Sequence, residues 1–273
     1  MPDLPRTSHI RLDLRGAVLH LWLDRPELRN ALSPQMVHEI AATFAAIAGD
    51  RTVRIVVLRG AGGTFCAGGD IKSMSAVGET PPPGALDDFK ENNRRFGAML
   101  EAVNSAPQVV IAAIEGYALG GGFGLACVAD MTIATADSRF AMSEVLIGVV
   151  PAAIAPFVVQ RIGLTAARRL GVSGVRIDAT EASTVGVAHV TVADTAALDA
   201  AIREACNLVL KCAPDAVAAT KALMLRAAGP SPIAELLDNA AEVFAAAVRS
   251  PEGREGTKAF VEKRKPSWVT QVE

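Results

Sequence analysis

The chain has 273 residues, a length that suits one large domain or one domain with a smaller appendage. Hydrophobic residues make up 51% of it, and the formal net charge of −2 points to neither nucleic acid nor a membrane as partner. The four cysteines form no CxxC pair and the N-terminus lacks the apolar core of a signal peptide, so we expect a cytoplasmic protein.

The first predicted elements are a β-hairpin and a helix. Residues 8–14 alternate between polar and apolar side chains, residues 17–23 are largely apolar, and the glycine between them suits a turn. Ser33 followed by Pro34 is an N-cap with proline in the first helical position, which predicts a helix to about residue 48.

Two mostly buried strands and a second helix follow. Residues 53–59 and 109–115 are rich in valine and isoleucine, which favours strands. Residues 87–104 have the spacing of an amphipathic helix, whereas the proline-rich stretch 80–84 cannot be helical. Strands that alternate with helices predict an α/β fold in which parallel strands are joined by helical crossovers.

The C-terminal part is predicted to be entirely helical. We expect an α/β core in residues 1–195 and a helical unit in residues 196–273, with helices at 196–212, 214–228, 231–248 and 252–263. The apolar faces of these helices suit either a partner subunit or the chain's own core, and the sequence does not distinguish the two.

Several kinds of chemistry are disfavoured by the motifs that the sequence lacks. The four histidines form no metal pair at helical spacing, and neither a GxSxG elbow nor a GxxxxGK[ST] phosphate loop is present. Gly122 and Gly124 begin a dinucleotide-like pattern, but Cys127 stands where that pattern needs its third glycine. We therefore expect no metal and no nicotinamide cofactor.

Two glycine-rich loops each follow a buried strand. The first is residues 64–70, TFCAGGD, and the second is Gly120 to Gly122, which opens a helix. Parallel α/β sheets place ligands outside the carboxyl ends of their strands, so both loops lie where an active site is expected. Small residues expose backbone N–H donors, and two donors that converge on one oxygen form an oxyanion hole.

Together with other segments, these loops resemble the crotonase, or enoyl-CoA hydratase/isomerase, superfamily. The resemblance runs almost from end to end and rests on the segments DRPELRNAL, FCAGGDIKSM, GYALGGGFGLACVADMTIATADSRFAMSEVLIGVVP and FVEKRKP. It implies a spiral of ββα units followed by a helical trimerisation domain. It also implies a homotrimer or a hexamer built as a dimer of trimers, and an acyl-CoA substrate with no further cofactor.

The resemblance assigns roles to individual residues. It implies that the N–H groups of Ala67 and Gly121 bind the thioester oxygen and that Glu144 is the acid/base. Glu115, by contrast, matches a position that is usually structural. The residues expected to hold substrate or coenzyme A are Leu28, Arg29, Ala31, Ala67, Gly68, Gly69, Asp70, Ile71, Gly120, Gly121, Gly124, Pro151, Phe260 and Lys263.

The sequence departs from the family's two-carboxylate pattern at Gly124, where hydratases carry their first glutamate. With Glu144 alone, three routes to hydration stay open: Glu144 handles both protons, Asp70 or Glu79 supplies a second acid, or a substrate carboxylate holds the water. A double-bond isomerase with one base and a non-catalytic acyl-CoA binder are the alternatives. We expect the missing side chain at Gly124 to open space.

Finer resemblance points to one branch of the family. The segment around Gly124, residues 151–159, Cys212-Ala213-Pro214 and residues 255–260 resemble isohexenylglutaconyl-CoA hydratases of acyclic terpene breakdown and, more loosely, methylglutaconyl-CoA hydratases. That resemblance implies a branched enoyl-CoA substrate bearing a carboxylate. Residues 149–159 are then expected near the acyl pocket, although packing in the core explains the same apolar stretch.

Overall fold

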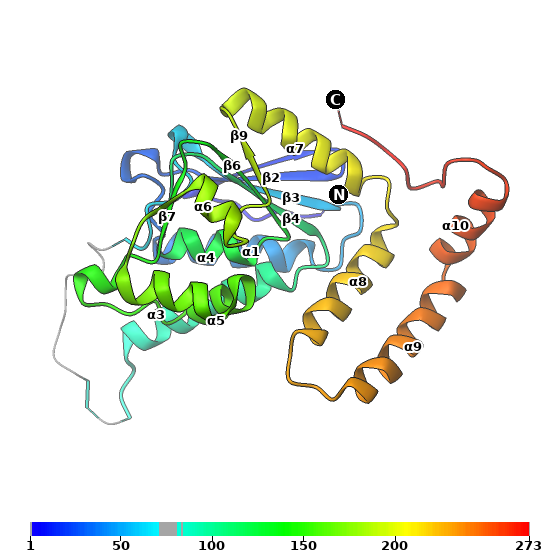
Figure 1. Ribbon diagram of the computed structural model, residues 1–273. Helices are drawn as coiled ribbons and strands as arrows, with labels where there is room; N and C mark the ends of the chain where they lie inside the picture. Colours follow the sequence, from blue (N-terminus) through cyan, green and yellow to red (C-terminus); the bar gives the residue numbers. More distant parts are fainter. Residues whose placement is uncertain (1, 71–80, 83, 273) are drawn as a thin grey trace.

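The computed structural model describes residues 2–70, 81–82 and 84–272, and it has an α/β core from which the C-terminal helices extend (Figure 1). The main sheet has six strands in the order β1-β2-β3-β4-β6-β9. These are β1 (Ile10–Arg15), β2 (Val18–Leu23), β3 (Ile55–Gly60), β4 (Val109–Ile114), β6 (Met131–Thr135) and β9 (Val190–Val192). Within this main sheet, as described, β1 and β2 pair antiparallel and all the other neighbours pair parallel, so the predicted hairpin and the predicted parallel sheet are both confirmed.

A smaller sheet stands beside the main one and consists of β5 (Tyr117–Leu119), β7 (Arg139–Ala141) and β8 (Ile177–Asp178). Cys66 extends it through a single parallel bridge to Ala118. The chain passes from the main sheet to the smaller sheet and then into a helix, first as β4-β5-α4 and then as β6-β7-α5. This repetition is the ββα spiral that the resemblance implies.

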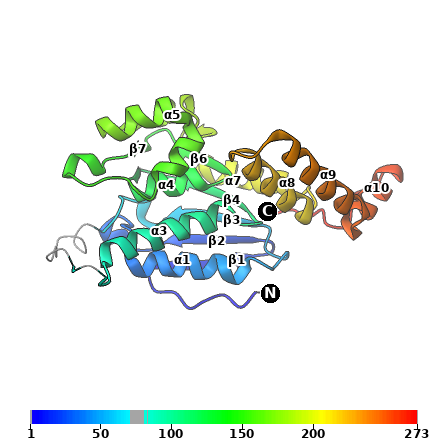
Figure 2. The ribbon, with the colours of Figure 1, turned by 90° about the horizontal axis from the view of Figure 1, so that it is seen from below.

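Both faces of the main sheet are covered by helices (Figure 2). The face with Leu19, Leu21 and Leu58 packs on α1 (Pro34–Ile47), α3 (Asp88–Asn104) and α4 (Gly121–Val128). The face with Ile55 and Val57 packs on α7 (Thr195–Val209). Alternate residues of each buried strand thus enter two separate cores, which explains why these strands are continuously apolar.

Polar groups fix the start of the chain on α1. The Ser33 side chain accepts the Met36 N–H as the predicted N-cap. Glu39 is 2% exposed, and its carboxylate accepts the backbone N–H groups of Ser8, His9 and Ile10. Burial alone would raise the pKa of Glu39, but hydrogen bonds, first from the Gln35 amide and then from these N–H groups, outweigh it and lower that pKa.

The last helices differ from the core in their packing. Helix α7 contributes Leu198 and Ile202 to the second core, so the change in packing falls between Leu210 and Pro214 and not at the expected boundary near residue 195. Helices α8 (Pro214–Ala227) and α9 (Ile233–Arg249) have no buried residue. Figures 1 and 2 show both, with α10 (Pro251–Val261), extending away from the sheet.

Most of the apolar surface of α8, α9 and α10 therefore does not cover the core of its own chain, although Val217 of α8 packs against the second core and Ala259 of α10 is buried. This leaves most of that surface uncovered, as the partner-subunit use left open by the sequence requires. Large apolar side chains stay exposed along them, namely Met224, Ile233, Leu237, Phe244, Val248, Phe260 and Val261. Lys221 on α8 fastens the unit to the core through an ion pair with Asp130, with 2.7 Å between Nζ and Oδ2. Within the described ranges no helix has the length and apolar character needed to cross a membrane.

Candidate active site

Three segments meet at the start of α4. The first glycine-rich loop joins β5, because the Leu119 N–H donates to the Cys66 carbonyl over 2.9 Å. The Gly120 N–H donates to the Ala141 carbonyl over 2.9 Å, which brings the end of β7 alongside. The residues that follow β7 lead into a short 3₁₀ helix, η3 (Glu144–Ile147). Its first residue, Glu144, therefore lies close to the start of α4.

Gly120 cannot carry a side chain without disturbing Glu144. Its backbone has φ +49° and ψ −117°, a combination open to glycine and strained for other residues. A Cβ atom there would lie 3.1 Å from Glu144 Oε1 and 3.6 Å from Gly68 Cα. The glycine is therefore needed for the close approach of the Glu144 carboxylate to Gly120 and Gly68.

The structure contradicts the donor role predicted for Ala67. The Ala67 N–H already donates to the Arg29 carbonyl over 3.0 Å, so it is not free to bind a substrate oxygen. Sequence matching placed the donor two residues too early, because only the backbone pairing shows which N–H groups point into the site.

Gly69 offers the free donor on this loop. It forms a parallel bridge with Leu32, in which the Leu32 N–H donates to the Gly68 carbonyl and the Asp70 N–H donates to the Leu32 carbonyl. In such a bridge the N–H of the middle residue points to the opposite side. Within the described part of the chain the Gly69 N–H has no hydrogen-bond partner.

Gly121 is the second donor. It is the first residue of α4, where the N–H groups have no carbonyl partner within the helix and the helix dipole is positive. A Cβ at Gly121 would lie 2.7 Å from Leu32 Cδ1. Leu32 thus touches both donor positions, through its backbone at Gly69 and through its side chain at Gly121, so the two N–H groups belong to one site.

Glu144 has the properties of an acid/base. Burial raises the pKa of its carboxyl group, and the hydrogen bond from its own N–H only partly offsets this. The Oε2 atom is buried and has no hydrogen-bond partner in the described residues. A carboxyl group that is desolvated and left unpaired can both accept and return a proton near neutral pH.

Of the two candidates for a second acid, only Asp70 lies within the described residues. Asp70, a candidate second acid, forms an ion pair with Arg25, with 3.2 Å between NH2 and Oδ2. Glu79, the other candidate, and Ile71, predicted to hold coenzyme A, lie outside the described residues. Within the described ranges no group of three or more His, Cys, Asp or Glu residues could hold a metal ion.

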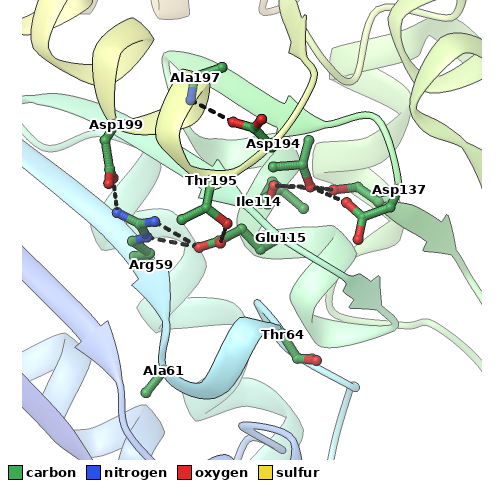
Figure 3. Close-up of polar contacts among 12 residues, drawn as sticks. Arg59, Ala61, Thr64, Ile114, Glu115, Asp137, Asp194, Thr195, Ala197 and Asp199 are labelled. Atoms are coloured by element: carbon green, nitrogen blue, oxygen red, sulfur yellow. Dashed lines mark hydrogen bonds and ion pairs between the residues drawn. The ribbon is translucent and has the colours of Figure 1, made fainter.

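Glu115 has a structural role, as expected. Figure 3 shows its carboxylate between the Arg59 guanidinium and the Thr195 hydroxyl. Arg59 Nε donates to Glu115 Oε2 over 2.9 Å, and Thr195 Oγ1 donates to Glu115 Oε1 over 2.7 Å. Arg59 also pairs with Asp199, so the group ties the ends of β3 and β4 to the first turn of α7. All of these oxygens are used by the fold, which leaves Glu115 unsuited to proton transfer.

Gly124 does not open space, contrary to expectation. A Cβ atom at this position would lie 2.3 Å from Ile154 Cγ2 and 3.6 Å from Leu100 Cδ1. The place of the family's first glutamate is therefore filled by a buried isoleucine from another segment, which sequence reasoning placed only within the apolar stretch 149–159.

The structure brings some of the predicted coenzyme A residues to the site and separates others. Residues 28–31 lie against the first glycine-rich loop, because the buried Asn30 amide donates to the Ala61 and Thr64 carbonyls. Asn30 was missed from the sequence, where an asparagine after an arginine gave no signal. Phe260 and Lys263 are on or just beyond α10, at the end of the molecule away from β7 and the start of α5 (Figures 1 and 2).

Two N–H donors and one desolvated carboxylate are groups that can stabilise and protonate an enolate, and here they lie on a ββα spiral. The family model for enoyl-CoA hydratase/isomerase matches residues 13–271. The chain belongs to this family, within the crotonase superfamily.

The chain is similar in sequence to known hydratases and dehydratases that act on coenzyme A thioesters. The chain is 35% identical to carnitinyl-CoA dehydratase of Proteus mirabilis, covering 96% of this chain and 98% of the relative. It is 33% identical to mevalonyl-coenzyme A hydratase SIDH of Beauveria bassiana, over 92% and 91%. These relatives support a hydro-lyase of the enoyl-CoA hydratase type.

Solved structures with the same fold are also similar in sequence. An enoyl-CoA hydratase/isomerase from Marinobacter aquaeolei is 50% identical with a TM-score of 0.91, covering 96% of this chain and 99% of the other. Pseudomonas aeruginosa AtuE is 48% identical with a TM-score of 0.91, covering 96% and 100%.

Proposed function

We propose that this enzyme adds water across the C2–C3 double bond of a branched 2-enoyl-CoA thioester of the glutaconyl type, such as isohexenylglutaconyl-CoA. The observation that carries the proposal is Glu144: its Oε2 is buried and unpaired, and its side chain lies against Gly120, the residue before the Gly121 donor. This combination suits the formation and protonation of an enolate.

The steps follow from the positions of these groups. The thioester oxygen accepts the Gly69 and Gly121 N–H groups, each worth about 3–4 kcal/mol as negative charge develops on that oxygen. Glu144 takes a proton from water as the water oxygen bonds to C3, and the double-bond electrons move onto the thioester oxygen. Glu144 then returns a proton to C2, so the carboxylate is regenerated and no cofactor beyond the coenzyme A thioester takes part.

An apolar surface beside Glu144 supports a substrate with an apolar branch. The Val149 N–H donates to the Glu144 carbonyl over 3.1 Å, which holds the segment 146–150 at the acid/base. Leu146 and Val150 are each 68% exposed, and Ile147 and Val149 are also exposed. Together with Pro151, these side chains offer a hydrocarbon chain a place to lie outside water.

We also propose that the chain works as a homotrimer, alone or paired into a hexamer, in the cytoplasm. The exposed apolar residues of α8 to α10 support assembly, because monomeric proteins rarely expose patches of this kind. In such an assembly Phe260, which is 85% exposed, and Lys263 reach the coenzyme A of a neighbouring subunit. The four cysteines are free thiols, in keeping with a reducing compartment.

A double-bond isomerase is the second candidate, and the single carboxylate favours it, since moving a proton between two carbons needs only one base. Mass separates the two functions. A hydratase product is heavier than its substrate by one water, whereas an isomerase product has an unchanged mass and takes up deuterium at C2 and C4.

The experiment is a mass-spectrometric assay of purified wild type and Glu144→Gln against a panel of 2-enoyl-CoA esters. The panel includes straight-chain, methylglutaconyl and isohexenylglutaconyl thioesters. We expect hydration fastest with the long branched ester and a loss of about 10²–10⁴-fold in the variant. No hydration of any ester would contradict the proposal, and identical ester affinity without turnover in both proteins would indicate a non-catalytic binder.

A further inference from the structure

The packing of α3 against α4 determines which side chains lie beside the Gly121 N–H donor. Gly121 and Gly124 are three residues apart on one face of α4, and Phe96 and Leu100 are four apart on one face of α3. Phe96 Cζ lies 3.0 Å from the Cβ position of Gly121, and Leu100 Cδ1 lies 3.6 Å from that of Gly124. The two faces therefore run together, with apolar side chains against the glycines.

Ile154, which belongs to a third segment, packs against the same face of α4. It stands directly before α5, is 1% exposed, and sets its Cγ2 atom 2.3 Å and its Cβ atom 3.0 Å from the Cβ position of Gly124. The neighbouring Ala153 lies against α3, 3.9 Å from the Cβ position of Gly97. The three atoms nearest to the missing side chain all belong to Ile154 and Leu100, so the surroundings are apolar.

This packing excludes more than a glutamate side chain. A water molecule or a small carboxylate ion needs both room and polar partners, and the three atoms nearest to the Cβ position of Gly124 are all carbon atoms within 3.6 Å of it. The only unpaired carboxylate oxygen that the described residues bury at the site is Glu144 Oε2, and the Glu144 side chain lies against Gly120.

We propose that Ile154 is a specificity-determining residue that limits the site to a single carboxylate. It occupies the place in which a residue at position 124 would present an acid/base, so water and protons reach the substrate only from the side of Glu144. This inference rests on the proposed hydration. It goes beyond that proposal by naming the side chain that excludes the second carboxylate.

The inference has a structural test that does not depend on activity. Gly124→Ala, Ile154→Ala and the double variant are compared by thermal unfolding. Gly124→Ala is expected to lower the melting temperature through the clash with Ile154, and the same change made in Ile154→Ala is expected to lower it far less. Equal losses in both backgrounds would overturn the packing argument, whatever the reaction proves to be.

The functional test is chemical rescue with formate, a small carboxylate. Glu144→Gln alone is expected to gain nothing from formate, because Ile154 closes the space beside Gly124. The double variant Glu144→Gln/Ile154→Ala is expected to gain at least about tenfold in hydration rate with rising formate, since a positioned acid/base contributes 10²–10⁴-fold. Chloride at the same concentration is the ionic-strength control.

The outcomes separate this inference from the proposed function. Rescue of Glu144→Gln alone would show that the space is open with Ile154 in place, which contradicts the inference. Absence of rescue in the double variant, with the packing coupling present, would show that Ile154 is only a packing residue, which also contradicts it. Undiminished hydration by Glu144→Gln would instead contradict the assignment of Glu144 in the proposed function.

Discussion

Replacing Gly120 with alanine tests how closely the glycine-rich loop is fitted to Glu144. The substitution places an L-residue at φ +49° and ψ −117°, and strain of this kind is worth about 1–3 kcal/mol. The new Cβ atom also lies 3.1 Å from Glu144 Oε1, closer than ordinary contact, so the carboxylate must move by a few tenths of an ångström. We expect both stability and catalysis to fall.

Gly16 provides a matched control. It has a similar positive φ of +57° in the β1–β2 turn, but nothing lies within 4 Å of its Cβ position. Gly16→Ala therefore carries backbone strain without the contact to Glu144. We expect it to lose stability and keep kcat, whereas Gly120→Ala loses stability and about 10–100-fold in kcat, since misplacement by 1 Å costs about 10²-fold.

Two measurements decide this prediction. Urea denaturation gives the free energy of unfolding of each variant, and hydration of the preferred enoyl-CoA gives kcat and KM. If Gly120→Ala keeps the wild-type kcat while losing no more stability than Gly16→Ala, then Gly120 serves the turn alone and the argument for its contact with Glu144 is refuted.

Three further predictions concern other parts of the molecule. Because burial raises the pKa of Glu144, the acidic limb of kcat/KM should lie above the ordinary glutamate pKa of about 4.3, and a limb at that value would contradict the desolvation. Glu39→Gln should lower the free energy of unfolding by about 2–3 kcal/mol. Since the folded-state pKa of Glu39 is lowered, its carboxylate stabilises the fold above the unfolded-state pKa, and this stabilisation is lost as pH falls through the folded-state pKa. A difference in the free energy of unfolding between the two proteins that does not change with pH in denaturant titrations would contradict this role of Glu39. Phe244→Asp on the exposed face of α9 should reduce the mass in solution to that of one chain, and an assembly of unchanged mass by light scattering would argue against this interface.

Much of the fold could be predicted because local signals and packing agree. The hairpin and the Ser33 cap of α1 carry clear local patterns, and β3 and β4 are short runs rich in valine and isoleucine, which favours strands. The short strands β5, β7 and β8 were not predicted, because elements of two or three residues have too few positions to show a period. Helix α7 was predicted as a helix, but its amphipathic pattern does not say which surface its apolar face meets.

The site was predicted only in part for a similar reason. Glycine-rich loops after buried strands indicate exposed N–H groups, but which N–H is free depends on pairing with Leu32, a residue more than thirty positions earlier. Open space was predicted at Gly124 because the sequence shows that a side chain is missing there. It does not show that the Ile154 side chain occupies the position. Long-range contacts of this kind decide chemistry without leaving a local pattern.

The central claim is that Glu144 alone moves both protons. The most direct measurement follows Glu144→Gln in D₂O by NMR, comparing the rate of deuterium exchange at C2 of the 3-hydroxyacyl thioester with the rate of its interconversion with the enoyl thioester. The account predicts that both rates fall together by about 10²–10⁴-fold. Exchange at C2 that persists at the wild-type rate while interconversion is lost would show that another group serves C2, and would contradict the account.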